Sequence, residues 1–375
     1  MKFAVCDDAE SLFADAAVWN ALSGGIPMRQ TQWLGPWWRH LGGDHTAMIV
    51  TARDDDGELI GALPLYRRGG GQTVGVMGDG DTCSDFVGPL CRPDDADAIC
   101  YRLGQHVGTL ATDPVHHWTE LDFDGGVEGD RTFERFVAGL QSLDCKTHVT
   151  SRMSCWRKIK EPTWADHLRC HGKTQRRRMR RWLERVDATD GLSHCDESTE
   201  ERFVRLVNDI IDLHQRRWND VDEEGSFADP RHREFMVETM TAFYRDGRAT
   251  TGAIAMDGQT IAGQMLIIGD DRVGYAYSTG YDIDHADTEP GQIVLVESLH
   301  QMYDDNGRYD AIEMMRGDEQ YKGRFTCQSR HQYHLRAFAP EMSSKLRGAA
   351  YQTRFTIKQL LRRAAGRELV DVAEL

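Results

Sequence analysis

The sequence predicts an α/β (α+β) protein with two domains, each built on a mixed, twisted sheet flanked by helices. Its 375 residues exceed the length that a single hydrophobic core usually supports. Stretches with the two-residue period of strands alternate with stretches of helical period along the chain. A similar hairpin also occurs in both halves, because an Asp-Gly turn precedes both ELIGALPLY at 58–66 and QTIAGQMLI at 259–267. This repetition favours two related domains.

The first half is predicted to begin with a short helix and to continue with strands and further helices. The helix contains the three tryptophans of TQWLGPWWRHLG, residues 31–42. A strand at 46–52 returns after a DDDG turn as the strand 58–66. Pro64 in this second strand lacks a backbone N–H, which favours a sheet edge or a bulge. The remaining elements are expected to be strands at 72–80, 84–90 and 117–123 and helices at 96–112 and 131–143.

The most basic segment of the chain, 173–186, predicts an amphipathic helix. Its apolar residues recur at helical spacing and form one stripe: Met179, Trp182, Leu183 and Val186. Arg176, Arg177 and Arg180 lie off this stripe and are candidates to bind an anionic substrate. A solvated charged face would show the same pattern, so both interpretations stay open.

The next predicted helix, 202–218, buries one apolar face and ends in a histidine and a tryptophan. His214 and Trp218 are candidates either for packing or for a substrate pocket. Its neighbours in the second half are a hairpin of strands 249–256 and 259–268 and a strand at 272–280. Tyr277 on that last strand is a further substrate-binding candidate.

A helix is predicted to open at Pro290 and Gly291 and to close at Gly307, before a strand at 309–315. Free backbone N–H groups and the positive end of the helix dipole suit a phosphate or pyrophosphate at such an N-terminus. Pro290, Gly291 and Gln292 are therefore candidates to hold the pyrophosphate of a co-substrate. An ordinary crossover helix between two strands would have the same spacing.

Four polar residues follow this strand in MRGDEQYKGRF and provide groups for acyl transfer. Such a reaction needs a base for the attacking amine, a proton donor for the leaving group and dipoles that stabilise the oxyanion. Asp318, Tyr321 and Lys322 are the catalytic candidates, and Glu319 is a candidate for substrate binding. A polar loop with a solvated ion pair is the alternative. Because no Gly-x-Ser-x-Gly motif is present, direct transfer is preferred to a covalent serine intermediate.

The segment 247–325 resembles the acetyltransferase-like domain of CelD-type proteins, which belong to the GNAT superfamily and are related to the FemAB aminoacyltransferases. The resemblance rests on DGRATTGAIAMDGQTIAGQMLIIGDDRVGYAYSTGYD and EPGQIVLVESLHQMYDDNGRYDAIEMMRGDEQYKGRF. LHQRRWND at 213–220, GSFADPRHREFM at 225–236 and the basic helix fit the same pattern, so it covers about residues 165–340. It departs from small GNAT enzymes in lacking their Gln/Arg-x-x-Gly-x-Gly/Ala signature, which leaves the donor open.

The resemblance implies two tandem GNAT-like domains, at 1–165 and 166–342, with a helical tail at 343–375. It also implies acyl-CoA as a co-substrate, with no permanently bound cofactor. The expected activity is transfer of an acyl group, most simply acetyl, to an amine of a sugar, lipid or peptide intermediate in envelope or exopolysaccharide synthesis. Two alternatives stay open: FemX-like transfer from aminoacyl-tRNA bound at the basic helix, and a non-catalytic partner of a polysaccharide synthesis system.

Composition narrows the possible partners and the compartment. The net charge of −15 argues against a protein whose whole surface binds DNA, other nucleic acid or an anionic membrane, although local basic patches stay open. No apolar run approaches the length of a membrane span, and the acidic start MKFAVCDDAE is unlike a signal peptide, so a cytoplasmic protein is expected. The nine cysteines are scattered without a Cys-x-x-Cys pair, and no metal site is expected. The sequence does not identify the acceptor or the oligomeric state.

Overall fold

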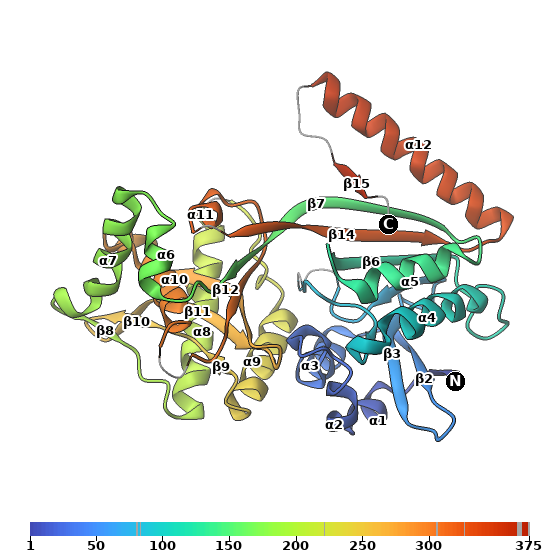
Figure 1. Cartoon of the computed structure of the whole chain (residues 1–375), viewed down its shortest axis with the longest axis horizontal. Coiled ribbons are helices and arrows are strands. Elements are labelled where there is room, and N and C mark those ends of the chain that lie inside the picture. The colour runs from blue at the N-terminus through green and yellow to red at the C-terminus, as the bar shows by residue number, and fades with distance from the viewer. Residues whose placement is uncertain are drawn as a thin grey trace. The chain divides into compact units, whose positions relative to one another are not determined.

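The structure is a computed structural model that describes residues 1–79, 82, 84–220, 222–304, 307–325, 327–365 and 370–373. The contacts between residues divide the chain into two compact units. The first unit comprises Met1–Ser154 and Arg330–Leu375, and the second comprises Cys155–Ser329 (Figure 1). The second unit is thus inserted into the chain of the first. The domain limits expected from the sequence, at 1–165, 166–342 and 343–375, stay predictions.

The first unit has a mixed sheet with helices against it, as predicted. Its strands lie in the order β1, β2, β3, β4, β6, β14, β7. β4 is parallel to β6, whereas β1 to β4 pair with one another in antiparallel register, as do β6 and β14. The strands are β1 (Lys2–Cys6), β2 (Thr46–Arg53), β3 (Leu59–Arg67), β4 (Thr73–Val76), β5 (Leu90–Cys91), β6 (Glu120–Val127), β7 (Lys146–Ile159), β14 (Gln328–Phe338) and β15 (Asp371–Ala373). The helices are α1 (Ala9–Phe13), α2 (Ala16–Asn20), α3 (Thr31–Leu41), α4 (Ala96–Leu110), α5 (Arg131–Gln141) and α12 (Met342–Ala364).

Two expectations for the strands of this unit are wrong. Pro64 marks neither a sheet edge nor a bulge, because β3 lies between β2 and β4 and its register with β2 is regular through Pro64. The missing N–H is tolerated because Pro64 falls between residues 61–62, which pair with β5, and residues 65–67, which pair with β4. Its carbonyl still accepts a hydrogen bond of 2.8 Å from the Met77 N–H. The strand expected at 84–90 is reduced to Leu90–Cys91, and the described residues before it form a loop.

From β7 onward the strands of the second unit follow in the order β7, β13, β12, β11, β10, β8. Only the β12–β13 pair is parallel among the registers described for these strands. The strands are β8 (Leu192–His194), β9 (Ala249–Thr250), β10 (Ile254–Met256), β11 (Gln259–Ile268), β12 (Val273–Tyr281) and β13 (Ala311–Arg316). The helices are α6 (Trp164–Arg169), α7 (Lys173–Ala188), α8 (Glu200–Asn219), α9 (Pro230–Arg245), α10 (Pro290–Gln301) and α11 (Gln320–Gly323).

The apolar stripe of the basic helix α7 is buried as predicted. Met179, Trp182 and Val186 join the core cluster that also contains residues of β11 and α10, and Leu183 packs against it. The arginines of α7 lie outside this stripe. The predicted amphipathic helix is therefore confirmed, and its buried face fixes α7 beside α10.

Two glycines let α8 lie against the β11–β12 hairpin. Gly263 and Gly280 are cross-strand partners, and a Cβ at Gly280 would stand 2.3 Å from the carbonyl oxygen of Ile210 on α8. A Cβ at Gly263 would stand 2.6 Å from Cδ1 of the same isoleucine. Because side chains alternate along a strand, Gln264 and Thr279 face away from α8. The glycines thus separate the packed face of this hairpin from the face that lines a cavity.

Within the described ranges, no helix combines the length and the hydropathy needed to cross a bilayer.

Candidate active site

A cavity of about 410 Å³ within the second unit is the candidate active site. Its size falls in the range of small-molecule sites in proteins. Strands β11 and β12, the N-terminus of α10, the end of α8 and the segment after β13 all contribute to its wall. The lining residues are Arg217, Gln264, Thr279, Tyr281, Ala286, Glu289, Pro290, Gly291, Gln292, Leu295, Glu319 and Tyr321.

The strand arrangement leaves this cavity open. The parallel register of β12 with β13 covers three residue pairs, from Val273 with Ala311 to Tyr275 with Glu313, whereas β12 continues to Tyr281. β13 changes direction soon afterwards, because Met315 has a φ of 55° and Gly317 a φ of 125°. A left-handed methionine is uncommon and is typical of a constrained, functional turn. The cavity residues of β12 come from the end of the strand beyond this register.

The N-terminus of α10 forms one wall, and it carries the three residues predicted to hold a co-substrate. Pro290 occupies the first helical position, after Glu289 with a left-handed φ of 57°. Gly291 and Gln292 follow and also line the cavity. The N-terminal turn of this 12-residue helix therefore faces the cavity, where an anion would be stabilised.

Helix α7 holds the loop that leads into α10. The Glu289 carboxylate accepts hydrogen bonds from Arg181 and, at 3.1 Å, from the indole N–H of Trp182. Arg185 donates to the carbonyl of Asp287 at 3.1 Å. The basic helix thus contributes to the site through Arg181 and Arg185, which were not singled out from the sequence.

Gln264 has an unmatched acceptor in the cavity wall. Its side chain is only 4% exposed, and its Nε2 donates to Oγ1 of Thr279 at 3.2 Å. Its Oε1 is buried and has no hydrogen-bond partner among the described residues. A buried acceptor without a partner costs about 1–3 kcal/mol, so its retention beside open volume points to a ligand that supplies an N–H or O–H. A glutamine within the apolar run of β11 was the available signal in the sequence.

Tyr321 is a proton donor in the wall at neutral pH. Burial, and then the charge of Glu319, raises the pKa of the Tyr321 phenol to about 12. Across the cavity, the Arg217 guanidinium lies over the rings of Trp218 and Tyr281, at 5.4 and 5.2 Å from their centroids. These contacts hold the Arg217 cation in the cavity wall. This residue was not among the candidates predicted from the sequence.

Lys322 is buried, and its ammonium group is bonded to polar groups of the neighbouring turn. Its Nζ donates to the carbonyls of Met315, Arg316 and Gly317 at 3.3, 2.9 and 3.3 Å, and it lies 2.9 Å from a Glu319 carboxylate oxygen. It thereby stabilises the turn at the end of β13. Asp318 is exposed, and neither Asp318 nor Lys322 is among the lining residues. Their catalytic roles stay predictions, with Lys322 placed as a support for the loop.

The remaining candidates lie away from the cavity lining. His214 is buried, its Nε2 accepts from the Trp218 indole at 3.0 Å, and burial, followed by the charge of Arg217, lowers its pKa to about 4. The Tyr277 hydroxyl lies 3.1 Å from Nε2 of His232. On α7, Arg177 and Arg180 are exposed and Arg176 is half-buried. The structure therefore brings together Pro290, Gly291, Gln292, Glu319 and Tyr321.

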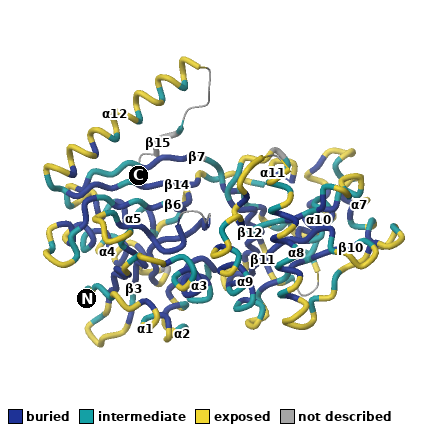
Figure 2. Tube along the Cα trace, turned by 180° about the vertical axis from the view of Figure 1, so that it is seen from behind, coloured by how far each residue is buried: buried dark blue, intermediate teal, exposed yellow. Residues whose placement is uncertain are grey.

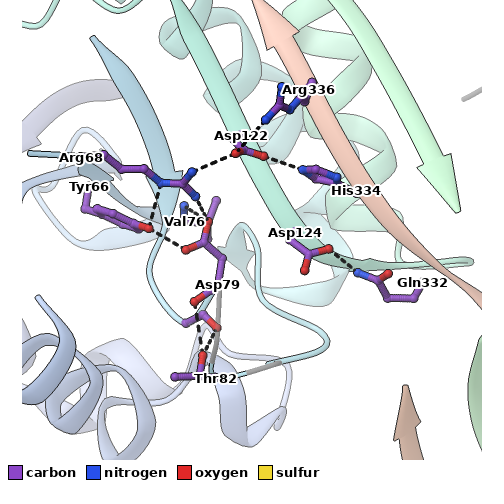
Figure 3. Close-up of polar contacts among 11 residues, drawn as sticks. Tyr66, Arg68, Val76, Asp79, Thr82, Asp122, Asp124, Gln332, His334 and Arg336 are labelled. Carbon is purple, nitrogen blue, oxygen red and sulfur yellow. Dashed lines mark hydrogen bonds and ion pairs between the residues drawn. The ribbon is translucent and has the colours of Figure 1, made fainter. Parts of the chain in front are cut away.

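A second group of buried polar residues lies in the first unit (Figure 3). Arg68 donates to Asp79 at 2.9 Å and to Asp122 at 2.8 Å, and the Tyr66 hydroxyl donates to Asp79 at 2.7 Å. His334, on β14, is bonded to the other oxygen of Asp122. Burial raises the pKa of Asp79 to about 7, although Arg68 and Tyr66 oppose this.

The side chains of the described ranges form no group of three or more His, Cys, Asp or Glu that could hold a metal ion.

The fold and this cavity define an α/β protein with a candidate small-molecule site at a helix N-terminus. Residues 173–323 match the family model of the acetyltransferase (GNAT) domain. This match covers about two fifths of the chain and supports an acyltransferase with a domain of the GNAT type. The superfamily predicted from the sequence is confirmed. No curated protein matches the chain.

Solved structures share the fold over nearly the whole chain. FemX is 10% identical, with 93% of this chain and 100% of FemX covered and a TM-score of 0.60. A conserved protein of unknown function from Bacteroides thetaiotaomicron VPI-5482 is 10% identical, with 90% and 100% covered and a TM-score of 0.56. L-PGS from Bacillus licheniformis is 14% identical, with 92% and 95% covered and a TM-score of 0.53. At such identities the likeness shows the fold alone, and it agrees with the predicted relation to FemAB proteins.

Proposed function

We propose that the second unit transfers an acyl group from an acyl-CoA, most simply acetyl-CoA, to an amine of a sugar, lipid or peptide intermediate of envelope or exopolysaccharide synthesis. The observation that carries this proposal is the cavity where the N-terminal turn of α10 meets the end of β12 beyond its register with β13. One wall suits an anion, and the other has a buried acceptor and a phenol. A thioester with a pyrophosphate at its far end has matching chemistry.

The donor would bind with its pyrophosphate at Pro290, Gly291 and Gln292, because helix N-termini stabilise phosphate groups. The amide-containing arm of CoA could then hydrogen-bond to the end of β12. Gln264 Oε1 would accept an N–H from the donor or from the acceptor amine, which would satisfy the unmatched atom.

The transfer would proceed by direct attack in a ternary complex. The neutral amine attacks the thioester carbonyl carbon, the C–S bond breaks and an amide forms. Tyr321, protonated at neutral pH, would give its proton to the leaving thiolate. The amine proton would pass to a carboxylate, for which Glu319 is better placed than Asp318, because Glu319 lines the cavity and Asp318 does not. Proton exchange with water then restores both groups.

A second candidate is aminoacyl transfer from a charged tRNA, and the observation that favours it is the likeness to FemX along almost the whole chain. In this case the exposed arginines of α7 would contact the tRNA backbone. Binding would then fall steeply with salt, because phosphate contacts release counterions.

The test is binding followed by turnover. Full-length protein is titrated by calorimetry with acetyl-CoA, longer acyl-CoAs and CoA alone, and thermal shift is measured in parallel, since a ligand of the native state raises its melting temperature. Release of free thiol with a panel of amines then reports transfer. Saturable binding of a CoA thioester with amine-dependent thiol release is the expected result. Absence of binding by every CoA species, with a salt-sensitive tRNA complex, would replace the proposal with the second candidate.

A further inference from the structure

Helix α12 carries an unusual surface for this protein. Residues 342–364 contain six Lys or Arg residues and no Asp or Glu, in a chain whose net charge is −15. Figure 2 shows the helix almost entirely as exposed, and only Ser344 and Gly348 are buried within it. Its cations are Lys345, Arg347, Arg354, Lys358, Arg362 and Arg363.

Large apolar side chains form a stripe on the outer face of the same helix. They are far more exposed than apolar residues usually are, between 52% and 75%: Met342, Leu346, Ile357, Leu360 and Leu361. At 100° per residue these positions fall within one sector about 100° wide. Ser344, Gly348, Tyr351 and Phe355, which are buried or half-buried, fall in the opposite sector. The stripe therefore faces away from the rest of the first unit.

Five of the six cations border this stripe, whereas Arg362 falls in the sector of Tyr351 and Phe355. Arg354, Lys358 and Arg362 follow one another at four-residue spacing and line a hollow of about 540 Å³ together with Tyr351 and Phe355. Lys345 and Arg363 lie on the other border by the same helical geometry. An apolar stripe between two cationic borders is the pattern of helices that lie in the plane of a membrane interface.

We propose that α12 attaches this protein to the surface of an anionic lipid bilayer. Its apolar stripe would lie at the boundary between headgroups and acyl chains, and the arginines and lysines beside the stripe would contact lipid phosphates. Charge decides between the possible occupants. A second copy of the helix would set six cations against six, which is unfavourable. A nucleic acid would use the cations but would leave the apolar stripe in water. An anionic bilayer matches both features at once.

This attachment would place the acyltransferase at a membrane surface without a spanning segment. It goes beyond the proposed function and is tested without substrate, so failure of either proposal leaves the other standing.

The test is flotation of the full-length protein with vesicles of phosphatidylcholine alone or with 30% phosphatidylglycerol, at about 50 and 300 mM NaCl. Binding is expected only with the anionic lipid and should weaken with salt. Leu360→Glu combined with Leu361→Glu should abolish flotation. Val115→Glu is the matched control, because Val115 is 74% exposed and lies outside the helix. Arg354→Glu combined with Lys358→Glu should weaken binding by at least about tenfold, since each cation near such a surface contributes roughly fivefold.

Circular dichroism and melting temperature should be unchanged in all variants, because every substituted side chain is exposed. The proposal is overturned if the wild-type protein fails to float with the anionic vesicles at low salt. It is also overturned if the double leucine variant floats like the wild type. Binding of tRNA that is kept in the leucine variant but lost in the variant with Arg354→Glu and Lys358→Glu would assign the helix to nucleic acid instead.

Discussion

The cavity of the second unit and the ion network of the first unit both bury polar side chains, and both contain a buried atom without a partner among the described residues: Oε1 of Gln264 in the cavity, and Nδ1 of His334 and Nε of Arg336 in the network. The unmatched atom of the cavity differs in that it borders open volume. In the network, the carboxylates of Asp79 and Asp122 are bonded to Arg68, Tyr66 and His334.

The pKa of Asp79 nevertheless moves further, to about 7, than that of Tyr321, to about 12. A displaced pKa alone therefore does not identify an active site. Open volume beside an unmatched polar atom is the better indicator here.

Tyr321→Phe is expected to have the largest effect. Loss of a positioned proton donor should lower single-turnover transfer by about a hundred- to ten-thousand-fold, with the melting temperature nearly constant. The matched control is Tyr277→Phe, which removes a hydroxyl bonded to His232 outside the cavity lining. Similar losses of rate in both variants would show that the cavity does not delimit the active site.

Gly291→Glu is expected to have the second-largest effect, because it adds a negative charge where an anion is proposed to bind. Affinity for acyl-CoA should fall by at least about tenfold, on the scale of a charge at a helix N-terminus. A Cβ here would stand 3.1 Å from the Tyr281 ring, so Gly291→Ala provides the steric control. Calorimetry that gave equal affinities for the alanine and glutamate variants would remove the pyrophosphate from this helix.

Replacing one glutamine by methionine in each unit tests the comparison between the cavity and the first unit directly. Gln264→Met should weaken ligand binding by about five- to twentyfold while stability is kept or increased, because an unmatched acceptor is removed. Gln332→Met, in the first unit, should instead lower stability by about 1–3 kcal/mol, since Gln332 donates to Asp124 at 2.6 Å and is buried. Chemical denaturation measures both. Destabilisation of equal size would mean that the cavity acceptor is as well satisfied as the network.

The smallest expected effect is a change in the pH dependence of stability. Because the folded pKa of Asp79, about 7, lies above its ordinary value, its contribution to stability is complete below about pH 4 and is lost as the pH rises through 7. Asp79→Asn should remove this slope, so that the melting temperature relative to wild type rises by at least about 2 °C between pH 5 and 8.

The exposed Asp94→Asn variant should show no such change with pH. A wild-type slope that persisted in Asp79→Asn would place the titration on another group. Asp122 acts in the opposite direction. Although its burial raises the pKa, its contacts with His334, Arg336 and Arg68 lower it overall, well below the usual range.

Local pattern was enough to predict much of the second unit. Helical spacing placed α7, α8 and α10, and residues adjacent in the chain, such as Pro290 to Gln292, reached the cavity together. Gln264 and Thr279 could not be paired in advance, because their meeting depends on the register of β11 with β12. Arg217 depends in turn on how closely α8 approaches that hairpin.

The wrong or incomplete predictions also depend on contacts that local sequence pattern does not show. Pro64 was assigned to an edge because local chemistry cannot show that β3 meets two short strands with a gap between them. Lys322 looked available in the sequence, yet the turn at Met315 and Gly317 directs three carbonyls onto its ammonium group. The bond between Asp122 and His334 joins residues 212 positions apart, which no local pattern reveals.

The insertion of the second unit into the chain of the first also constrains how the protein is made. β14 lies between β6 and β7 in strand order, but it is synthesised after every residue of the second unit. During translation the second unit can therefore complete its contacts while the first still lacks an inner strand. A nascent chain stopped at Ser329 would hold the whole second unit, while the strands of the first unit still lacked β14 and left the edges of β6 and β7 open, which is where a chaperone would be needed.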